Sequence, residues 1–240
     1  FVTFVDRDSG DRMWRQNVAS ASERILGLTY SPGIDRVYVL TETQVVTLDS
    51  DTGQPVTMGA GRMTQDLEWI AASPPIEVGD LICYGARSGQ LVWQNPQMGF
   101  FWRAYQIGAS VNLAPALSGN TIVAIGSSGA IAALDAGSAS RLWGTQLLSG
   151  ITAPPAIGPD ALFVAGLDQY LRCYDLQTGR TVWKILTETR LVDGPTLLGD
   201  RLYQQIPGKG LLCVEATPVD QPGGVEHWTC AQNHGVAVAQ

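Results

Sequence analysis

Residues 171–183 read Leu-Arg-Cys-Tyr-Asp-Leu-Gln-Thr-Gly-Arg-Thr-Val-Trp, and this stretch decides the fold. Its first residues alternate at a period of two, as the two faces of a β-strand require. Asp175 then opens a tight turn in which Gly179 is free to adopt a positive φ. Val182 and Trp183 begin the returning strand. The stretch therefore predicts a strand, a tight turn and a second strand.

The same pattern recurs along the chain, with its tryptophan positions separated by 40 to 45 residues. Thr57 stands where the second tryptophan would fall. Two copies depart from the motif. One has a rearranged turn with Pro96 and Gly99, and the other carries the insertion Pro218–Gly224. The turn aspartates are Asp6, Asp49, Asp135 and Asp175, the turn glycines are Gly10, Gly53 and Gly179, and the tryptophans are Trp14, Trp102, Trp143, Trp183 and Trp228. A fixed period of this length is typical of a repeat architecture.

Each full period also contains further short strands and turns upstream of the motif. Apolar segments such as Arg36–Leu40 and Asn120–Ala124 follow turn signals, and no segment shows a helical period. Four short antiparallel strands in each period predict an all-β chain, a β-propeller of four-stranded blades. We expect one domain over 1–240, with a half blade at 1–21, full repeats at 22–62, 63–107, 108–147, 148–188 and 189–232, and the start of a closing blade at 233–240.

The repeated motif Ala/Cys-x-Asp-x-x-Thr-Gly-x-x-x-Trp resembles the tryptophan-docking motif of the quinoprotein-like (PQQ-like) β-propeller repeat family. That family includes quinoprotein alcohol dehydrogenases and the propeller lipoprotein of the outer-membrane β-barrel assembly machine. The resemblance implies that Trp14, Trp143 and Trp183 each pack on a neighbouring blade, where an indole can bury its ring and donate to a backbone carbonyl. The copies that end at Trp14 and Trp183 fit the motif most closely.

The two ends of the chain are complementary but incomplete. Joining the tail to the head supplies the first, third and fourth strands of a blade and no second strand. The chain is therefore either a six-blade equivalent or a segment of a seven- to eight-bladed propeller. The resemblance favours the segment, because members of the family commonly have eight blades.

Composition excludes some functions. The net charge of −7 and the scattered basic residues argue against a nucleic-acid partner. No apolar run approaches the length of a membrane span and no signal peptide is visible, so a lipid anchor would lie outside this chain.

Cys173 and Cys213 occupy the same motif position in adjacent blades, and we expect buried free thiols there. No pairing is compelling for Cys83 or Cys230.

The sequence offers no catalytic, cofactor or metal site. It lacks the adjacent cysteine pair of quinoprotein dehydrogenases, and the motif aspartates are explained as turn formers. His227, Cys230 and His234 have a zinc-like spacing, but strand alternation points His227 and Cys230 to different faces. We therefore expect no enzymatic activity and no cofactor, with PQQ and calcium as the alternative.

Aromatic residues crowd the end of the second full period. They could fill gaps left by the rearranged turn, which is the simpler interpretation. They could instead form an exposed surface that binds a partner, because Trp, Tyr, Phe and Met are enriched at interfaces. The residues of this candidate surface are Trp93, Phe100, Phe101 and Tyr105, with Trp69, Met98 and Trp102 nearby.

The leading functional hypothesis is a non-catalytic scaffold that binds proteins, including extended peptides or strand segments, in the periplasm or elsewhere outside the bacterial cytoplasm. One alternative is a ligand-sensing ectodomain of a larger signalling protein. Another is part of a PQQ-dependent quinoprotein dehydrogenase whose cofactor residues lie in other blades. Fold resemblance alone does not decide between them.

Overall fold

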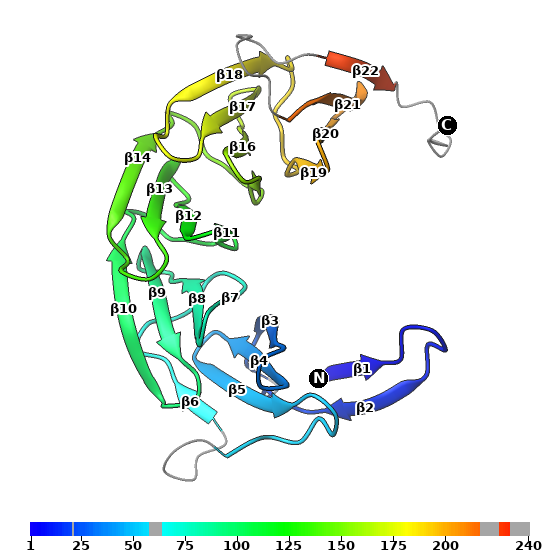
Figure 1. The fold of residues 1–240 in the computed structure, drawn as a ribbon, viewed down its shortest axis with the longest axis vertical. Coiled ribbons are helices and arrows are strands. Elements are labelled where there is room, and N and C mark those ends of the chain that lie inside the picture. The colour runs from blue at the N-terminus through cyan, green and yellow to red at the C-terminus, as the bar shows by residue number, and fades with distance from the viewer. Residues whose placement is uncertain (21, 58–63, 217–225, 231–240) are drawn as a thin grey trace. The chain divides into compact units, whose positions relative to one another are not determined.

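The computed structural model describes residues 1–20, 22–57, 64–216 and 226–230, and all regular structure in these residues is β-strand (Figure 1). The chain divides into two compact units, Phe1–Pro115 and Ala116–Gln240. No helix in the described residues is long and apolar enough to cross a membrane.

The first unit contains one two-stranded and two four-stranded antiparallel sheets. The two-stranded sheet pairs β1 (Val2–Val5) with β2 (Arg12–Gln16). The next sheet runs β3 (Ile25–Ser31), β4 (Arg36–Thr41), β5 (Gln44–Asp49) and β6 (Thr64–Asp66). The third runs β7 (Ile76–Val78), β8 (Leu81–Gly85), β9 (Gln90–Asn95) and β10 (Phe100–Gln106).

The second unit contains three four-stranded antiparallel sheets, each in chain order. The first is formed by β11 (Ala116–Ser118), β12 (Thr121–Ile125), β13 (Ala130–Asp135) and β14 (Arg141–Gln146). The second is formed by β15 (Ala156–Ile157), β16 (Ala161–Ala165), β17 (Tyr170–Asp175) and β18 (Thr181–Leu186). The third is formed by β19 (Thr196–Leu198), β20 (Arg201–Ile206), β21 (Gly210–Glu215) and β22 (Glu226–Cys230).

These sheets confirm the predicted fold class of four-stranded antiparallel propeller blades. One predicted boundary differs: β6 belongs to the sheet that begins at β3, so that repeat extends past residue 62. The predicted closing strand at 233–240 and the whole insertion at 218–224 lie outside the described residues.

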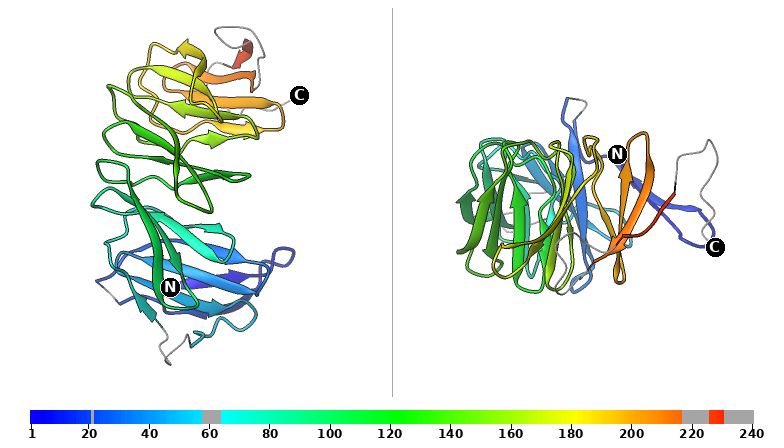
Figure 2. Two further views of the ribbon diagram at one scale, coloured as in Figure 1. Left: turned by 60° about the vertical axis from the view of Figure 1, so that its left-hand side comes forward. Right: turned by 90° about the horizontal axis from the view of Figure 1, so that it is seen from above.

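Successive sheets within a unit lie face to face (Figure 2). Buried apolar side chains fill the space between them and form the core. The middle strands of the blades carry apolar residues on both faces, because each face packs against a neighbouring sheet. In the second unit, Phe163, Cys173 and Trp183 of one sheet pack with Leu202 and Val214 of the next. Burial of these side chains supplies the main stabilisation of the stack, at about 25 cal/mol for each Å² of apolar surface removed from water.

A β-bulge is repeated at the fourth strand of the blades. In β18, Val182 is the extra residue, because Cys173 pairs with Trp183 while Tyr174 pairs with Thr181. The same register shift occurs between β13 and β14, where Leu142 is the extra residue. Bulges bend a strand and re-aim its side chains. Here the extra residue is turned toward solvent and the residue after it faces the next blade.

Candidate functional site

The motif turns are closed by their aspartate side chains. Asp175 Oδ1 accepts hydrogen bonds from the Thr178 backbone N–H at 2.7 Å and from the Thr178 hydroxyl at 2.6 Å. These bonds hold the pKa of Asp175 below its ordinary value. Gly179 then adopts a φ of +70°. Asp6, Asp49 and Asp135 close their turns in the same way.

Two tryptophans bind the motif turn of the following blade. Trp143 Nε1 donates to the Leu176 carbonyl oxygen at 2.7 Å, and a Cβ added to Gly179 would lie 2.5 Å from the Trp143 ring. Trp14 Nε1 donates to the Ser50 carbonyl oxygen at 2.8 Å in an equivalent arrangement. The turn glycine is therefore required both by its positive φ and by the indole that lies against it.

Trp183 is also buried, with 2 % of its surface exposed, and packs against Phe163 at a centroid distance of 5.9 Å. Its indole N–H has no acceptor among the described residues. Cys213, in the next blade, pairs with Trp228 of β22, but the side chain of Trp228 lies outside the described residues.

Trp102 does not occupy the blade-docking position that the sequence predicted for it. It is the bulge residue of β10, because Phe101 pairs with Gln94 while Arg103 pairs with Trp93. Half of its surface is therefore exposed (50 %). The docking position belongs to Arg103. Spacing could have shown this, since eight positions separate Asn95 from Arg103, as they separate Asp175 from Trp183.

Trp93 does not belong to an exposed surface, which corrects the other part of the prediction. Only 1 % of its surface is exposed. It occupies the third-strand position held by Ala133 and Cys173 in other blades, and it pairs with Arg103 where those residues pair with tryptophans. In the β7–β10 blade the buried tryptophan of this pair is therefore on the third strand, whereas in the two other blades it is on the fourth strand.

The remaining aromatic residues of the prediction lie on β10, which is an edge strand of its sheet (Figure 1). Phe100, Phe101, Trp102 and the nearby Met98 are exposed, and we call these four residues the β10 surface. Phe100 and Trp102 lie 6.2 Å apart between ring centroids. Tyr105, also predicted, is half-buried and stands apart from them along the strand.

One ring of this surface packs on the segment between β6 and β7. Phe101 packs edge-to-face on Trp69 with a centroid distance of 5.0 Å. A hollow of about 270 Å³ lies beside Phe100 and Phe101, lined also by Asp66 and Glu68. Asp66 accepts a hydrogen bond from the side chain of Gln44 at 2.9 Å. The β10 surface is therefore a group of exposed apolar side chains, one of which packs on Trp69, with two carboxylates at its border.

The cysteines and acidic residues form no reactive cluster in the part of the chain that the structure describes. Cys83, Cys173 and Cys213 are buried free thiols. Burial raises the pKa of Cys173 to about 12 and that of Cys83 well above its ordinary value. Within the described ranges, no three His, Cys, Asp or Glu side chains converge as metal ligands.

The family description "Outer membrane protein assembly factor BamB" matches residues 71–185 and 128–239. The chain belongs to the BamB family, a family of PQQ-like propeller repeats. A BamB from Francisella salina is 37 % identical over 82 residues, which are 34 % of this chain and 15 % of that protein. The chain thus spans well under two thirds of this relative.

Two solved structures share the fold. The crystal structure of BamB from Moraxella catarrhalis aligns with a TM-score of 0.62 at 20 % identity, over 88 % of this chain and 63 % of that chain. The computationally designed protein Ika8 aligns with a TM-score of 0.72 at 14 % identity, over 89 % of this chain and 64 % of that chain. At these identities the BamB likeness in structure supports the propeller fold alone.

Proposed function

We propose that this chain is part of a protein-interaction scaffold that serves the assembly of outer-membrane proteins, and that its β10 surface binds a protein partner. Membership of the BamB family supports the scaffold role. The exposed rings of Phe100, Phe101 and Trp102 carry the assignment to β10. The proposal puts the protein outside the cytoplasm of a bacterium and gives it no catalytic role.

The chemistry of the β10 surface suits a protein partner. Aromatic residues and methionine are enriched at interfaces, where their large area contributes strongly to binding. Phe101 is already held by its contact with Trp69, so little side-chain entropy of this ring is lost on binding.

The backbone and the border of the surface add two further modes of contact. β10 pairs with β9 on one side only, so an extended segment of the partner could add as a further strand. Asp66 and Glu68 at the neighbouring hollow favour a partner segment that carries basic side chains beside apolar ones.

Site-specific photo-cross-linking in cells tests this proposal. A benzoylphenylalanine is placed at position 102 and, as a matched control, at position 142, because Trp102 and Leu142 are both bulge residues with 50 % and 49 % exposure. We expect position 102 to form an adduct with an identified component of outer-membrane protein assembly, and position 142 to form little. Equal adducts from both positions, or adducts at 102 only with unrelated proteins, would overturn the proposal.

Affinity measurements on the cross-linked partner extend the test. Trp102→Ala should weaken binding about 30-fold, the effect of losing about 2 kcal/mol at a central aromatic contact. Leu142→Ala is the matched control and should leave the affinity unchanged. If the two variants weakened binding equally, the effect would not be specific to β10, and the proposed interface would be wrong.

A further inference from the structure

The tryptophan that binds the next motif turn is missing from the blade that begins at β3. Eight positions separate Asp6 from Trp14 and Asp135 from Trp143, and the same spacing from Asp49 leads to Thr57. Thr57 is exposed and far smaller than an indole. The position that an indole fills elsewhere in the chain is therefore held by a hydroxyl and a methyl group.

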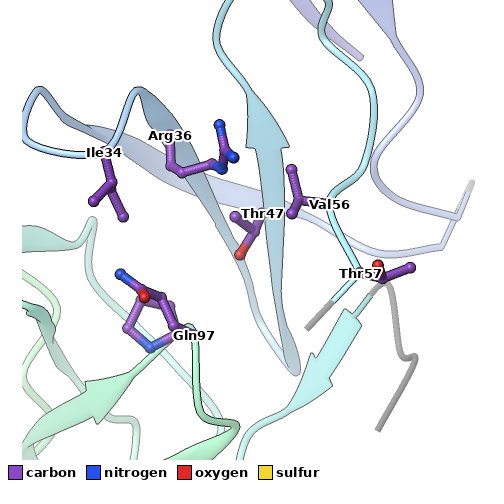
Figure 3. A pocket seen from close by; sticks show the side chains of 7 residues that line it. Ile34, Arg36, Thr47, Val56, Thr57 and Gln97 are labelled. Atoms are coloured by element: carbon purple, nitrogen blue, oxygen red, sulfur yellow. The ribbon is translucent and has the colours of Figure 1, made fainter. Parts of the chain in front are cut away.

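A hollow of about 360 Å³ lies at this position (Figure 3). Its volume falls in the lower part of the range of ligand pockets, about 300–1,000 Å³. Side chains of the β3–β6 sheet line one side and the turn between β9 and β10 lines the other. The lining residues are Ile34, Arg36, Thr47, Val56, Thr57, Pro96 and Gln97.

The turn that borders the hollow has the geometry of the turns that receive tryptophans. Asn95 Oδ1 accepts hydrogen bonds from the backbone N–H groups of Gln97 at 2.9 Å and Met98 at 2.8 Å, and the second corresponds to the bond from the Thr178 N–H to Asp175 Oδ1. Gly99 follows with a φ of +77°. Pro96 corresponds to Leu176, whose carbonyl oxygen accepts the indole N–H of Trp143. The receiving half of the docking site is thus intact.

The floor of the hollow carries a buried hydroxyl group. Thr47 is 3 % exposed, and its Oγ1 has no hydrogen-bond partner within the described part of the chain. A buried hydroxyl without a partner is unfavourable by about 1–3 kcal/mol. Thr47 takes the place of Ala133, the residue that pairs with Trp143. A ring bound in this hollow would therefore lie over Thr47.

Neighbouring polar groups fix the walls of the hollow. Arg36 Nη1 donates to Asp49 Oδ2 at 2.9 Å and to the Asp35 carbonyl oxygen at the same distance. Gln97 Nε2 donates to the Tyr38 hydroxyl at 3.4 Å. The arginine is held at the side of the hollow and is thus available to stack on an aromatic face.

We propose that this hollow binds an indole side chain of a partner polypeptide, in the manner in which the Leu176 turn binds Trp143. The indole N–H would donate to the Pro96 carbonyl oxygen, and its ring would pack on Thr47 and Val56. The identity of the partner as a polypeptide rests on the proposed scaffold function. The preference for an indole rests on the two filled sites, at Ser50 and Leu176, and not on that function.

The test uses the whole chain and N-acetyltryptophanamide as the probe, followed by methyl NMR. We expect saturable shifts at the methyl groups of Ile34 and Val56. N-acetylleucinamide, the matched control ligand, should leave these signals in place. Absence of shifts at both residues, or equal shifts with the leucine amide, overturns the proposal.

Two variants sharpen the result. Thr57→Trp supplies the missing indole from the chain itself, so we expect this variant to lose probe binding and to melt at a higher temperature. Thr196→Trp, at an exposed threonine of β19, is the control and should change neither probe binding nor the melting temperature. Retained probe binding in Thr57→Trp contradicts the assignment. A negative result here leaves the cross-linking at position 102 untouched, so the two proposals fail separately.

Discussion

Gly179→Ala tests most sharply whether tryptophan docking holds neighbouring blades together. Alanine at a φ of +70° is strained by about 1–2 kcal/mol. Its Cβ would also lie 2.5 Å from Cδ2 and Cε3 of Trp143, so the indole must move away and lose its hydrogen bond to the Leu176 carbonyl. That loss adds about 0.5–1.5 kcal/mol, and the poorer packing adds more. We expect the free energy of unfolding to fall by about 2–4 kcal/mol in total.

Gly199→Ala is the matched control in the same unit. Gly199 has a φ of +62°, but a Cβ there meets nothing within 4 Å, so only the backbone strain of about 1–2 kcal/mol applies. Urea unfolding followed by fluorescence and circular dichroism measures both variants. In a Trp143→Ala background, the loss from Gly179→Ala should shrink to that of Gly199→Ala. Equal losses for the two glycine variants in the natural background would refute the docking argument.

Three further predictions concern burial and charge. Trp93→Ala should lower the free energy of unfolding by about 3–5 kcal/mol, because a buried ring is lost, whereas Trp102→Ala should change it by no more than about 0.5 kcal/mol. Asp175→Asn should keep its turn, as the equivalent Asn95 does, and should reduce the acid sensitivity of folding. The folded pKa of Asp175 is lowered, so its contribution is present above the ordinary value of 3.8 and is lost as the pH falls below it. Cys83 and Cys173 should resist a thiol reagent at pH 8 in the native protein and react in urea, as mass spectrometry of the labelled peptides can show.

Each of these predictions has an outcome that contradicts it. Similar destabilisation by the two tryptophan variants would mean that Trp93 and Trp102 do not differ in burial. An identical fall in the urea midpoint between pH 6 and pH 2 for Asp175→Asn and the natural protein would deny the aspartate a role in acid sensitivity. Rapid labelling of Cys173 in the native state would show that its blade is open to solvent.

The blades could be predicted from the sequence because local chemistry and long-range packing agree there. An aspartate that closes its own turn, a glycine at positive φ and a tryptophan eight positions on leave little freedom, as the Asp175 hairpin shows. The four-stranded antiparallel sheets that this pattern predicts are therefore observed. At β6 the observed sheet extends to Asp66, beyond the predicted boundary at residue 62, because the strand segment that pairs with the start of β5 begins only at Thr64.

The candidate surface was predicted less well, and the error has a physical cause. Both faces of a middle strand are buried in a propeller, so the period of two could not show that Trp93 faces a neighbouring blade. The prediction also assigned Trp102 to the docking position because it is a tryptophan. The spacing of eight positions from Asn95 leads instead to Arg103. The hollow at Thr57 lies between two neighbouring sheets. A sequence pattern within one repeat could not predict it, because the pattern does not show how two sheets pack.

Hydrogen–deuterium exchange of the protein, alone and with the outer-membrane protein assembly machinery purified from its source organism, tests the central functional claim most directly. Amides of β10, Phe100–Gln106, should gain protection when the complex forms, while those of β14 and β18, the equivalent strands of two other blades, should exchange unchanged. Unchanged exchange at β10 in a complex that protects β14 or β18 would show that partners bind elsewhere on the chain.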